Sequence, residues 1–334
     1  PTERATSSYT VDRSMGPVLS FNTYNDIFHF LGEPTYGEIE GDQGDWEFVI
    51  TKLTDDSIFV KGKKWENEMV FTRMADGVDW TSYLDSIADV QKRLGVNYSV
   101  GNSSDASKMV EINSATRRIL SRTADGQMVE QPFYVTPTGI HAVNEPVALG
   151  EDKAQDFLVS KAGVMTAKDN EALTLNTYAP GIDTWVGDWT LSAMQGSCDM
   201  TISKVEDQEN MLMGTFTTGG YTYNIGLSFN PETGALNLPS QLIDDPSGRY
   251  PALWLMNADL NKGMLLGQGG MNVVWHGVSQ EGDFEDDGTL ASEGYASDTF
   301  VALACTTKGE PIKENNQYVF VIEWYYLSNL TPNK

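Results

Sequence analysis

Apolar and polar residues alternate along most of the chain, and this alternation predicts a mainly β protein. Short runs rich in Val, Ile, Thr, Tyr, Phe and Trp are separated by Gly, Asn, Asp and Pro. Residues 45–53, 57–65 and 68–74 predict three antiparallel strands in a meander, with a turn at Asp55 and Asp56 between the first two. This pattern is typical of a sandwich or a barrel.

Two segments have helical periodicity instead. A long helix is predicted over 79–94, with Lys92 and Arg93 in its last turn and Gly95 as its stop. Its apolar face consists of Trp80, Tyr83, Leu84, Ile87, Val90 and Leu94. A short helix is predicted over 24–31, after the strand GPVLSF and a capping pair at Thr23 and Asp26.

The short helix has an apolar face formed by Tyr24, Ile27, Phe28 and Leu31. His29 points away from that face, which predicts a histidine at the surface or rim. The segment is therefore interpreted as a helical plug at one end of a barrel, and as a mark of the fold more than of the chemistry.

The length of 334 residues favours two domains, and Pro180-Gly181 is the predicted boundary. The first domain, 1–180, is β-rich with the long helix inserted; its segment 96–116 is polar and weakly patterned, and strands resume at 133–143, 156–165 and 172–179. The second domain, 181–334, is predicted to be an antiparallel barrel-like or calycin-like closed sheet. Its eight candidate strands are 188–194, 199–205, 210–218, 221–230, 251–259, 271–279, 298–307 and 318–327.

The two halves share short stretches of sequence. GDWEF at 44–48 is similar to GDWTL at 187–191, and LSFN occurs at 19–22 and at 227–230. Such matches arise by chance among β-rich segments or reflect an internal repeat. If the repeat is real, the first domain lacks its opening strands, because few residues precede the first LSFN.

The chain carries 47 acidic and 22 basic residues, a net charge of −25 that repels nucleic acid and anionic lipid. This acidity suits divalent cations or a solubilising surface. No apolar run is long enough to span a bilayer, and Pro1 without a leader suggests a processed or trimmed chain. The two cysteines, Cys198 and Cys305, are either free thiols or a disulfide.

Four stretches resemble the blocks of a family of Bacteroidetes envelope lipoproteins known only as a domain of unknown function: 7–34, 37–64, 133–149 and 229–243. The resemblance implies a cell-envelope protein at the outer-membrane surface or in the periplasm, held by a lipid anchor that this chain does not contain. It further implies an accessory role beside an outer-membrane importer complex in nutrient uptake. It carries over no catalytic residues.

No motif predicts catalysis. His29, His141 and His276 each stand alone, without a metal-ligand or nucleophile spacing. His276 alternates with Val274 and Val278, which favours a half-buried structural histidine over a ligand.

One acidic loop resembles the start of a calcium site, because Asp283, Glu285 and Asp287 alternate before Gly288. The bidentate Glu expected at the twelfth position is Gly294, so a solvated acidic loop is the alternative. Calcium is the one cofactor that the sequence suggests.

Aromatic residues offer a further candidate site, with the core as the alternative fate of their side chains. Strands 251–259 and 318–327 are apolar on both faces and are therefore buried or line a cavity. The predicted ligand-binding residues are Trp254, Trp275, Trp324 and Tyr326.

These observations predict a non-enzymatic surface accessory protein that binds a glycan or peptide, or docks on an uptake complex. One alternative is a glycoside hydrolase with two carboxylates across an aromatic cleft, and another is a purely structural surface protein.

Overall fold

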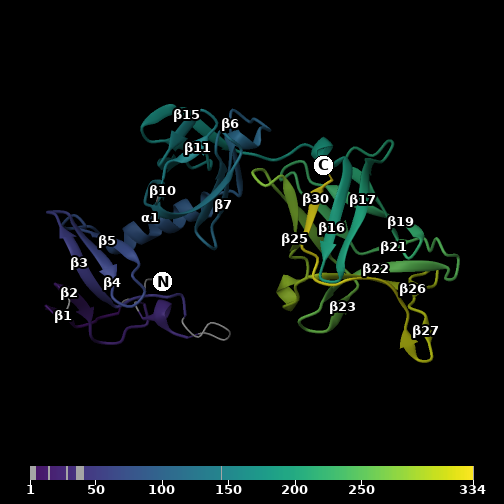
Figure 1. The fold of residues 1–334 in the computed structure, drawn as a ribbon. Helices are drawn as coiled ribbons and strands as arrows, with labels where there is room; N and C mark the ends of the chain where they lie inside the picture. The colour runs from purple at the N-terminus through teal and green to yellow at the C-terminus, as the bar shows by residue number, and fades with distance from the viewer. Residues whose placement is uncertain (1–4, 14–15, 28, 35–40, 144, 334) are drawn as a thin grey trace. The chain divides into compact units, whose positions relative to one another are not determined.

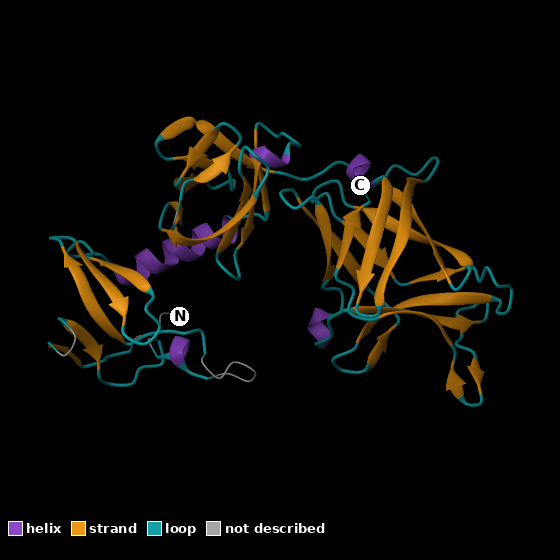
Figure 2. Ribbon diagram, viewed as in Figure 1, coloured by secondary structure: helices purple, strands orange, loops and turns teal. Residues whose placement is uncertain are grey.

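The computed structural model describes residues 5–13, 16–27, 29–34, 41–143 and 145–333. It confirms a mainly β protein, with one α-helix among these residues (Figures 1 and 2). The chain divides into two compact units, Pro1–Ser86 and Ile87–Lys334, and the division falls within helix α1 (Trp80–Arg93).

The first unit contains one antiparallel sheet whose five strands follow one another in sequence order. They are β1 (Tyr9–Asp12), β2 (Val18–Phe21), β3 (Glu47–Leu53), β4 (Ser57–Gly62) and β5 (Glu68–Thr72). The predicted meander is confirmed as β3, β4 and β5. Phe48 lies at its centre, fully buried, with the rings of Phe21 and Phe71 packed edge-on against it.

The short helix predicted over 24–31 is wrong. The structure has a single 3-10 turn, η1 (Phe30–Gly32), and the predicted apolar face is turned outward, with Tyr24 54% and Ile27 51% exposed. The interaction with residues 44–46 overrides the local periodicity: the Gly44 N–H donates to the Leu31 carbonyl at 2.9 Å. Phe28 lies outside the described residues.

His29 is buried and not at the surface as expected. Its imidazole stacks on Trp46, with the ring centres 5.2 Å apart. Gly32 permits this packing, because a Cβ there would lie 2.6 Å from the Trp46 ring.

The long helix is confirmed as α1. Asp79 caps it, since its carboxylate accepts the N–H groups of Thr81 and Ser82. Val90 is fully buried in the core of the first barrel, and Ile87 packs against the same core.

The first barrel of the second unit closes in the order β10-β13-β14-β15-β6-β7-β8-β9. Its strands are β6 (Asn97–Val100), β7 (Met109–Asn113), β8 (Arg118–Arg122), β9 (Met128–Thr136), β10 (Gly139–Ala142), β13 (Asp156–Val159), β14 (Met165–Ala167) and β15 (Asn170–Thr177). Strands β11 (Val147–Leu149) and β12 (Asp152–Ala154) form a side hairpin, and η2 (Ala106–Lys108) precedes β7. The weakly patterned segment 96–116 thus contains two barrel strands, β6 and β7.

The second barrel closes in the order β16-β17-β18-β19-β20-β24-β25-β30. Its strands are β16 (Gly187–Ala193), β17 (Gly196–Lys204), β18 (Met211–Thr218), β19 (Tyr221–Phe229), β20 (Leu236–Pro239), β24 (Gly270–His276), β25 (Glu281–Asp286) and β30 (Asn329–Pro332). The turn η3 (Ile182–Trp185) leads into β16, so the predicted boundary at Pro180-Gly181 falls between the two barrels.

Three of the eight strands expected in this barrel belong instead to a separate sheet, ordered β21-β22-β26-β29 with β23 paired to β22. Its strands are β21 (Gln241–Ile243), β22 (Ala252–Asp259), β23 (Met264–Leu266), β26 (Thr299–Cys305) and β29 (Phe320–Trp324). The barrel is completed by β20, β25 and β30, which the sequence pattern did not reveal. The turn η4 (Ala291–Glu293) and the hairpin β27 (Lys313–Glu314) with β28 (Gln317–Tyr318) complete the unit.

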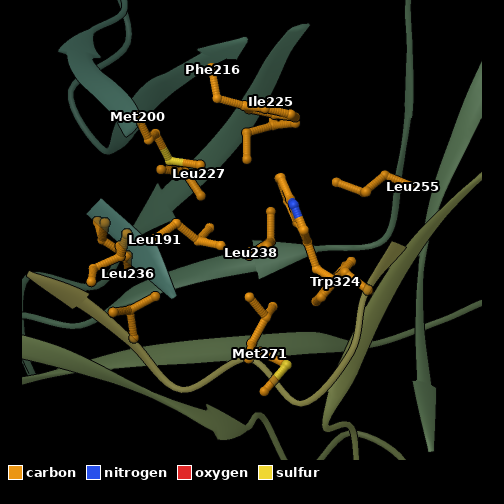
Figure 3. Close-up of a cluster of buried hydrophobic side chains, with 14 of the residues drawn as sticks. Leu191, Met200, Phe216, Ile225, Leu227, Leu236, Leu238, Leu255, Met271 and Trp324 are labelled. Atoms are coloured by element: carbon orange, nitrogen blue, oxygen red, sulfur yellow. The ribbon is translucent and has the colours of Figure 1, made fainter. Parts of the chain in front are cut away.

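The second barrel and this sheet share one hydrophobic core (Figure 3). Leu191, Leu238 and Met271 come from the barrel, whereas Leu255 and Trp324 come from the sheet. Burial explains the two apolar faces of β22, whereas β29 buries Ile322 and Trp324 and leaves Phe320 exposed. Cys305 is buried in β26, Cys198 is partly buried in β17, and both are free thiols.

The two halves do not repeat one another in strand register. In the first unit Gly62 pairs with Phe48, which lies 62 − 48 = 14 residues earlier in the chain. In the second barrel Gly214 pairs with Ile202, which lies 214 − 202 = 12 residues earlier, so the registers differ. The two LSFN stretches also differ: β2 pairs with β1 and β3, but β19 pairs with β18 and β20.

Candidate binding groove

A groove of about 410 Å³ opens where the β18–β19 hairpin approaches the start of β29. The loop 244–251 that follows β21 forms its third side. We call it the aromatic groove, and it is lined by Thr218, Gly219, Tyr221, Tyr223, Ser247, Arg249, Tyr250, Val319, Phe320 and Val321.

Two aromatic side chains of the groove face solvent, Tyr221 at 45% and Phe320 at 42% exposure. Tyr223 is buried beneath them and stacks on Phe216, with ring centres 5.4 Å apart and an interplanar angle of 17°. Phe216 in turn lies 4.6 Å from the Trp324 ring (Figure 3). The floor of the groove is therefore continuous with the packed core and has little freedom to move.

A charged pair lies beside these rings. Arg249 Nη2 donates to both carboxylate oxygens of Glu314, at 2.9 and 3.0 Å, and the Tyr250 hydroxyl donates to the same carboxylate at 2.9 Å. The Arg249 guanidinium also lies 5.0 Å from the centre of the Tyr250 ring. These contacts hold a cation, a carboxylate and a phenol at one side of the groove.

The loop is organised by Asp245, whose carboxylate accepts the Tyr250 N–H at 2.8 Å and the Ser247 N–H at 3.0 Å. Burial alone would raise the pKa of Asp245, but the hydrogen bonds from Tyr250 and Ser247 outweigh it and lower that pKa. Burial raises the pKa of Tyr223 and of Tyr250, so both phenols keep their protons at neutral pH. The Tyr250 phenol therefore remains a hydrogen-bond donor to Glu314 at neutral pH.

The four aromatic residues predicted to bind a ligand do not lie on one surface. Trp275 and Trp324 are in the core, where Trp275 packs against Trp185 and Trp324 supports the groove floor. Trp254 lines a separate hollow of about 390 Å³ with Leu265 and Tyr295. Tyr326 follows β29 and is 39% exposed. Their role in binding stays a prediction.

The three predicted calcium ligands have separate surroundings. Asp283 lies 3.4 Å from His276 Nε2, Glu285 is exposed, and Asp287 accepts the Thr289 N–H at 2.9 Å. Within the described residues, no three His, Cys, Asp or Glu side chains gather as a metal site.

The residues that sequence reasoning missed are Tyr221, Arg249, Tyr250 and Phe320. In the sequence, Phe320 belongs to a strand whose apolar residues indicate a core, and Tyr221 begins the predicted strand 221–230. The residues of the groove meet through pairings between distant strands, so no local spacing marks them.

Fold and groove together define a mainly β protein with two closed barrels, the second extended by a sheet that borders an aromatic groove. Residues 1–161 match the model of a family described as "Domain of unknown function (DUF4302)". The match covers the first sheet and the first barrel as far as β13, and the groove lies outside it. No curated protein and no solved structure matches the chain. No described helix is long and apolar enough to cross a membrane.

Proposed function

We propose that the protein is a non-enzymatic accessory protein of the cell envelope that binds a glycan in the aromatic groove. The observation that carries the proposal is the convergence of Tyr221, Phe320 and Tyr250 beside the Arg249–Glu314 pair. The envelope location is supported by the resemblance of the sequence to envelope lipoproteins.

Aromatic faces suit sugar rings, because the C–H groups on one face of a sugar pack on an aromatic ring with loss of apolar surface to water. Tyr221 and Phe320 are the exposed rings here, and the rigid Tyr223 below them fixes the groove floor. A preformed surface of this kind binds without a large ordering cost.

The polar side of the groove suits hydroxyl groups, which both donate and accept hydrogen bonds. Arg249 supplies N–H donors, and Glu314 supplies an acceptor held in place by Arg249 and Tyr250. A neutral sugar matches this paired arrangement, since the two charges offset each other.

The groove does not suit a glycoside hydrolase. Its described lining contains no Asp or Glu, and the two nearby carboxylates are engaged: Asp245 by Ser247 and Tyr250, and Glu314 by Arg249 and Tyr250. Glycoside hydrolysis needs two carboxylates flanking the bond, about 5–10 Å apart, one of them protonated.

The test is a glycan array followed by calorimetry on the best neutral glycan, with the Tyr221→Ala and Phe320→Ala variants. Each variant is expected to raise Kd about three- to tenfold, because it removes one stacking face. The matched control is Tyr9→Ala, which removes an exposed aromatic ring of the first unit; its Kd should equal that of the wild type.

Absence of any glycan ligand, or binding that is unchanged in both groove variants, would contradict the proposal. Preferential binding of extended peptides would show that the ligand is a peptide and would also contradict the proposal. Release of reducing sugars from a bound glycan would show that the protein is a hydrolase.

A further inference from the structure

The connection between β24 and β25, residues 277–280, packs against the outside of the first barrel, with Gly277 and Val278 buried. On β6 and β7 the inward positions include Tyr98 and Val110, which belong to that barrel's core. The neighbouring residues Asn97, Met109 and Glu111 face outward yet are buried, at 8%, 1% and 8% exposure. They are buried because the β24–β25 connection covers them: a Cβ on Gly277 would lie 2.5 Å from Met109 Sδ.

Side chains of the first barrel satisfy the backbone of this connection. Asn97 donates to the Trp275 carbonyl at 2.5 Å and accepts the Gly277 N–H at 2.8 Å. Glu111 Oε1 accepts the N–H groups of Val278 and Ser279, at 2.5 and 3.0 Å.

Arg122 Nε donates to the Val278 carbonyl at 2.7 Å. We call this set of contacts the barrel junction. Because its polar groups are buried, breaking it would leave donors and acceptors unsatisfied.

His276 lies within the barrel junction between two carboxylates. Its Nδ1 is 3.2 Å from Glu111 Oε2, and its Nε2 is 3.4 Å from Asp283 Oδ2. Nε2 is buried and makes no hydrogen bond within the described part of the chain. The imidazole therefore lies between an acid of the first barrel, Glu111, and an acid of the second barrel, Asp283.

The other charged groups around His276 are mostly acidic. Glu281 pairs with His276 across β24 and β25, and Glu285 and Glu130 line the adjoining hollow with Arg118. Arg122 is already engaged with Val278. A neutral imidazole would leave Glu111 and Asp283 without a cation between them.

We propose that the barrel junction is a pH-sensitive lock, closed when protonated His276 bridges Glu111 and Asp283 and loosened when His276 is neutral. The hydrogen bond to Glu111 raises the pKa of His276, and the charges of Asp283 and Glu281 raise it further. Burial opposes this increase but does not cancel it. Stabilisation by a group with a raised folded pKa is complete below its unfolded value, about 6.5, and is lost as pH rises through the folded value.

The experiment is amide hydrogen exchange of the full chain between pH 6 and pH 9, corrected for the intrinsic pH dependence of exchange. The amides to follow are those of Gly277, Val278 and Ser279, which donate to Asn97 and Glu111. Their corrected exchange rates are expected to rise about tenfold as His276 loses its proton, because the loss of one hydrogen bond to a charged group corresponds to roughly that factor.

His276→Gln keeps a polar side chain but does not titrate, so its corrected rates at these amides should not change between pH 6 and pH 9. The matched control is His141→Gln, which removes a histidine 2.9 Å from Asp156 elsewhere in the first barrel; it should keep the wild-type response. Wild-type rates that are independent of pH, or a response that persists in His276→Gln, would overturn the proposal.

Discussion

Trp185 shows how one residue joins the segment between the two barrels, residues 178–186, to the second barrel. Its ring is completely buried and lies 5.5 Å from Trp189 and 5.4 Å from Trp275. Its indole N–H donates to the Gly234 carbonyl at 2.8 Å. Because it ends η3 two residues before β16 begins, it secures the beginning of the barrel wall.

Replacing Trp185 with Phe is expected to lower the free energy of unfolding by about 2–4 kcal/mol. The variant leaves a cavity and an unsatisfied carbonyl at Gly234. Urea unfolding followed by near-ultraviolet circular dichroism would measure the change. Trp80→Phe, at a side chain 51% exposed, should change stability by less than about 0.5 kcal/mol, and equal effects would contradict this role.

At the same scale, the sequence identified which residues were notable but not where they would lie. Trp275 and Trp324 alternate with apolar neighbours, a pattern compatible with a core or with a cavity wall. Both side chains lie in the core because the sheet containing β29 covers the barrel. That sheet forms by pairing of strands far apart in the chain, which the local pattern does not reveal. The exposure of Tyr221 and Phe320 also depends on how distant strands pair, so the local pattern does not predict it.

At the scale of elements, local patterns were sufficient where local contacts decide the structure. The meander β3–β5 and helix α1 were predicted correctly because each depends on neighbours in sequence. The helix over 24–31 was wrong because Gly44 and Trp46 engage Leu31 and His29 from outside the segment. Strands such as β20 and β30 are too short for their alternation to be distinctive.

The loop that carries Arg249 and Tyr250 offers a test at this scale. Asp245→Asn should weaken glycan binding about three- to tenfold, because hydrogen bonds to a charged carboxylate are about twice as strong as neutral ones. Faster exchange of the Tyr250 amide, which donates to Asp245, would show loosening of the loop without any glycan.

Acid should have the same effect on the wild type. A lowered native pKa means that the contribution of Asp245 is present above its unfolded value of about 3.8 and is lost as pH falls through the native value. After correction for the intrinsic pH dependence of exchange, exchange of the Tyr250 amide should therefore accelerate in acid in the wild type but not in Asp245→Asn. The matched control is Asp105→Asn, which removes a similar carboxylate bonded to Ser107 in the first barrel; it should leave the acid response at Tyr250 intact.

For the whole molecule, we expect the barrel junction to determine whether the two barrels unfold together. Asn97→Ala removes both its bonds to the β24–β25 connection and leaves the Trp275 carbonyl and the Gly277 N–H buried without Asn97. We expect the free energy that couples unfolding of the two barrels to fall by about 2–4 kcal/mol. The single calorimetric transition expected for the wild type should then separate into two in the variant.

Asn224→Ala is the control for that experiment, since Asn224 is exposed and bonds only Thr215 among the described contacts. It should leave the transition unchanged. A single transition of unaltered shape in Asn97→Ala would show that the barrels are coupled by other contacts.

The architecture as a whole was predictable only in part. A mainly β chain with a closed sheet in its second half follows from strand count and spacing. A closed barrel over 97–177 does not, because its first strand, β6, has only four residues and closes the sheet by pairing with β15, its last strand. The division of the later strands between a barrel and a sheet depends on register, which composition and periodicity do not specify.

The pairing of β30 with both β16 and β25 also orders events during synthesis on the ribosome. Every strand of the first barrel has been made once Thr177 emerges, whereas Leu191 must wait for Leu330. Until then β16 and β25 each carry a free edge, the kind of surface that recruits strands from other chains. A chain released before residue 329 would therefore carry a finished first barrel and a second one prone to aggregate.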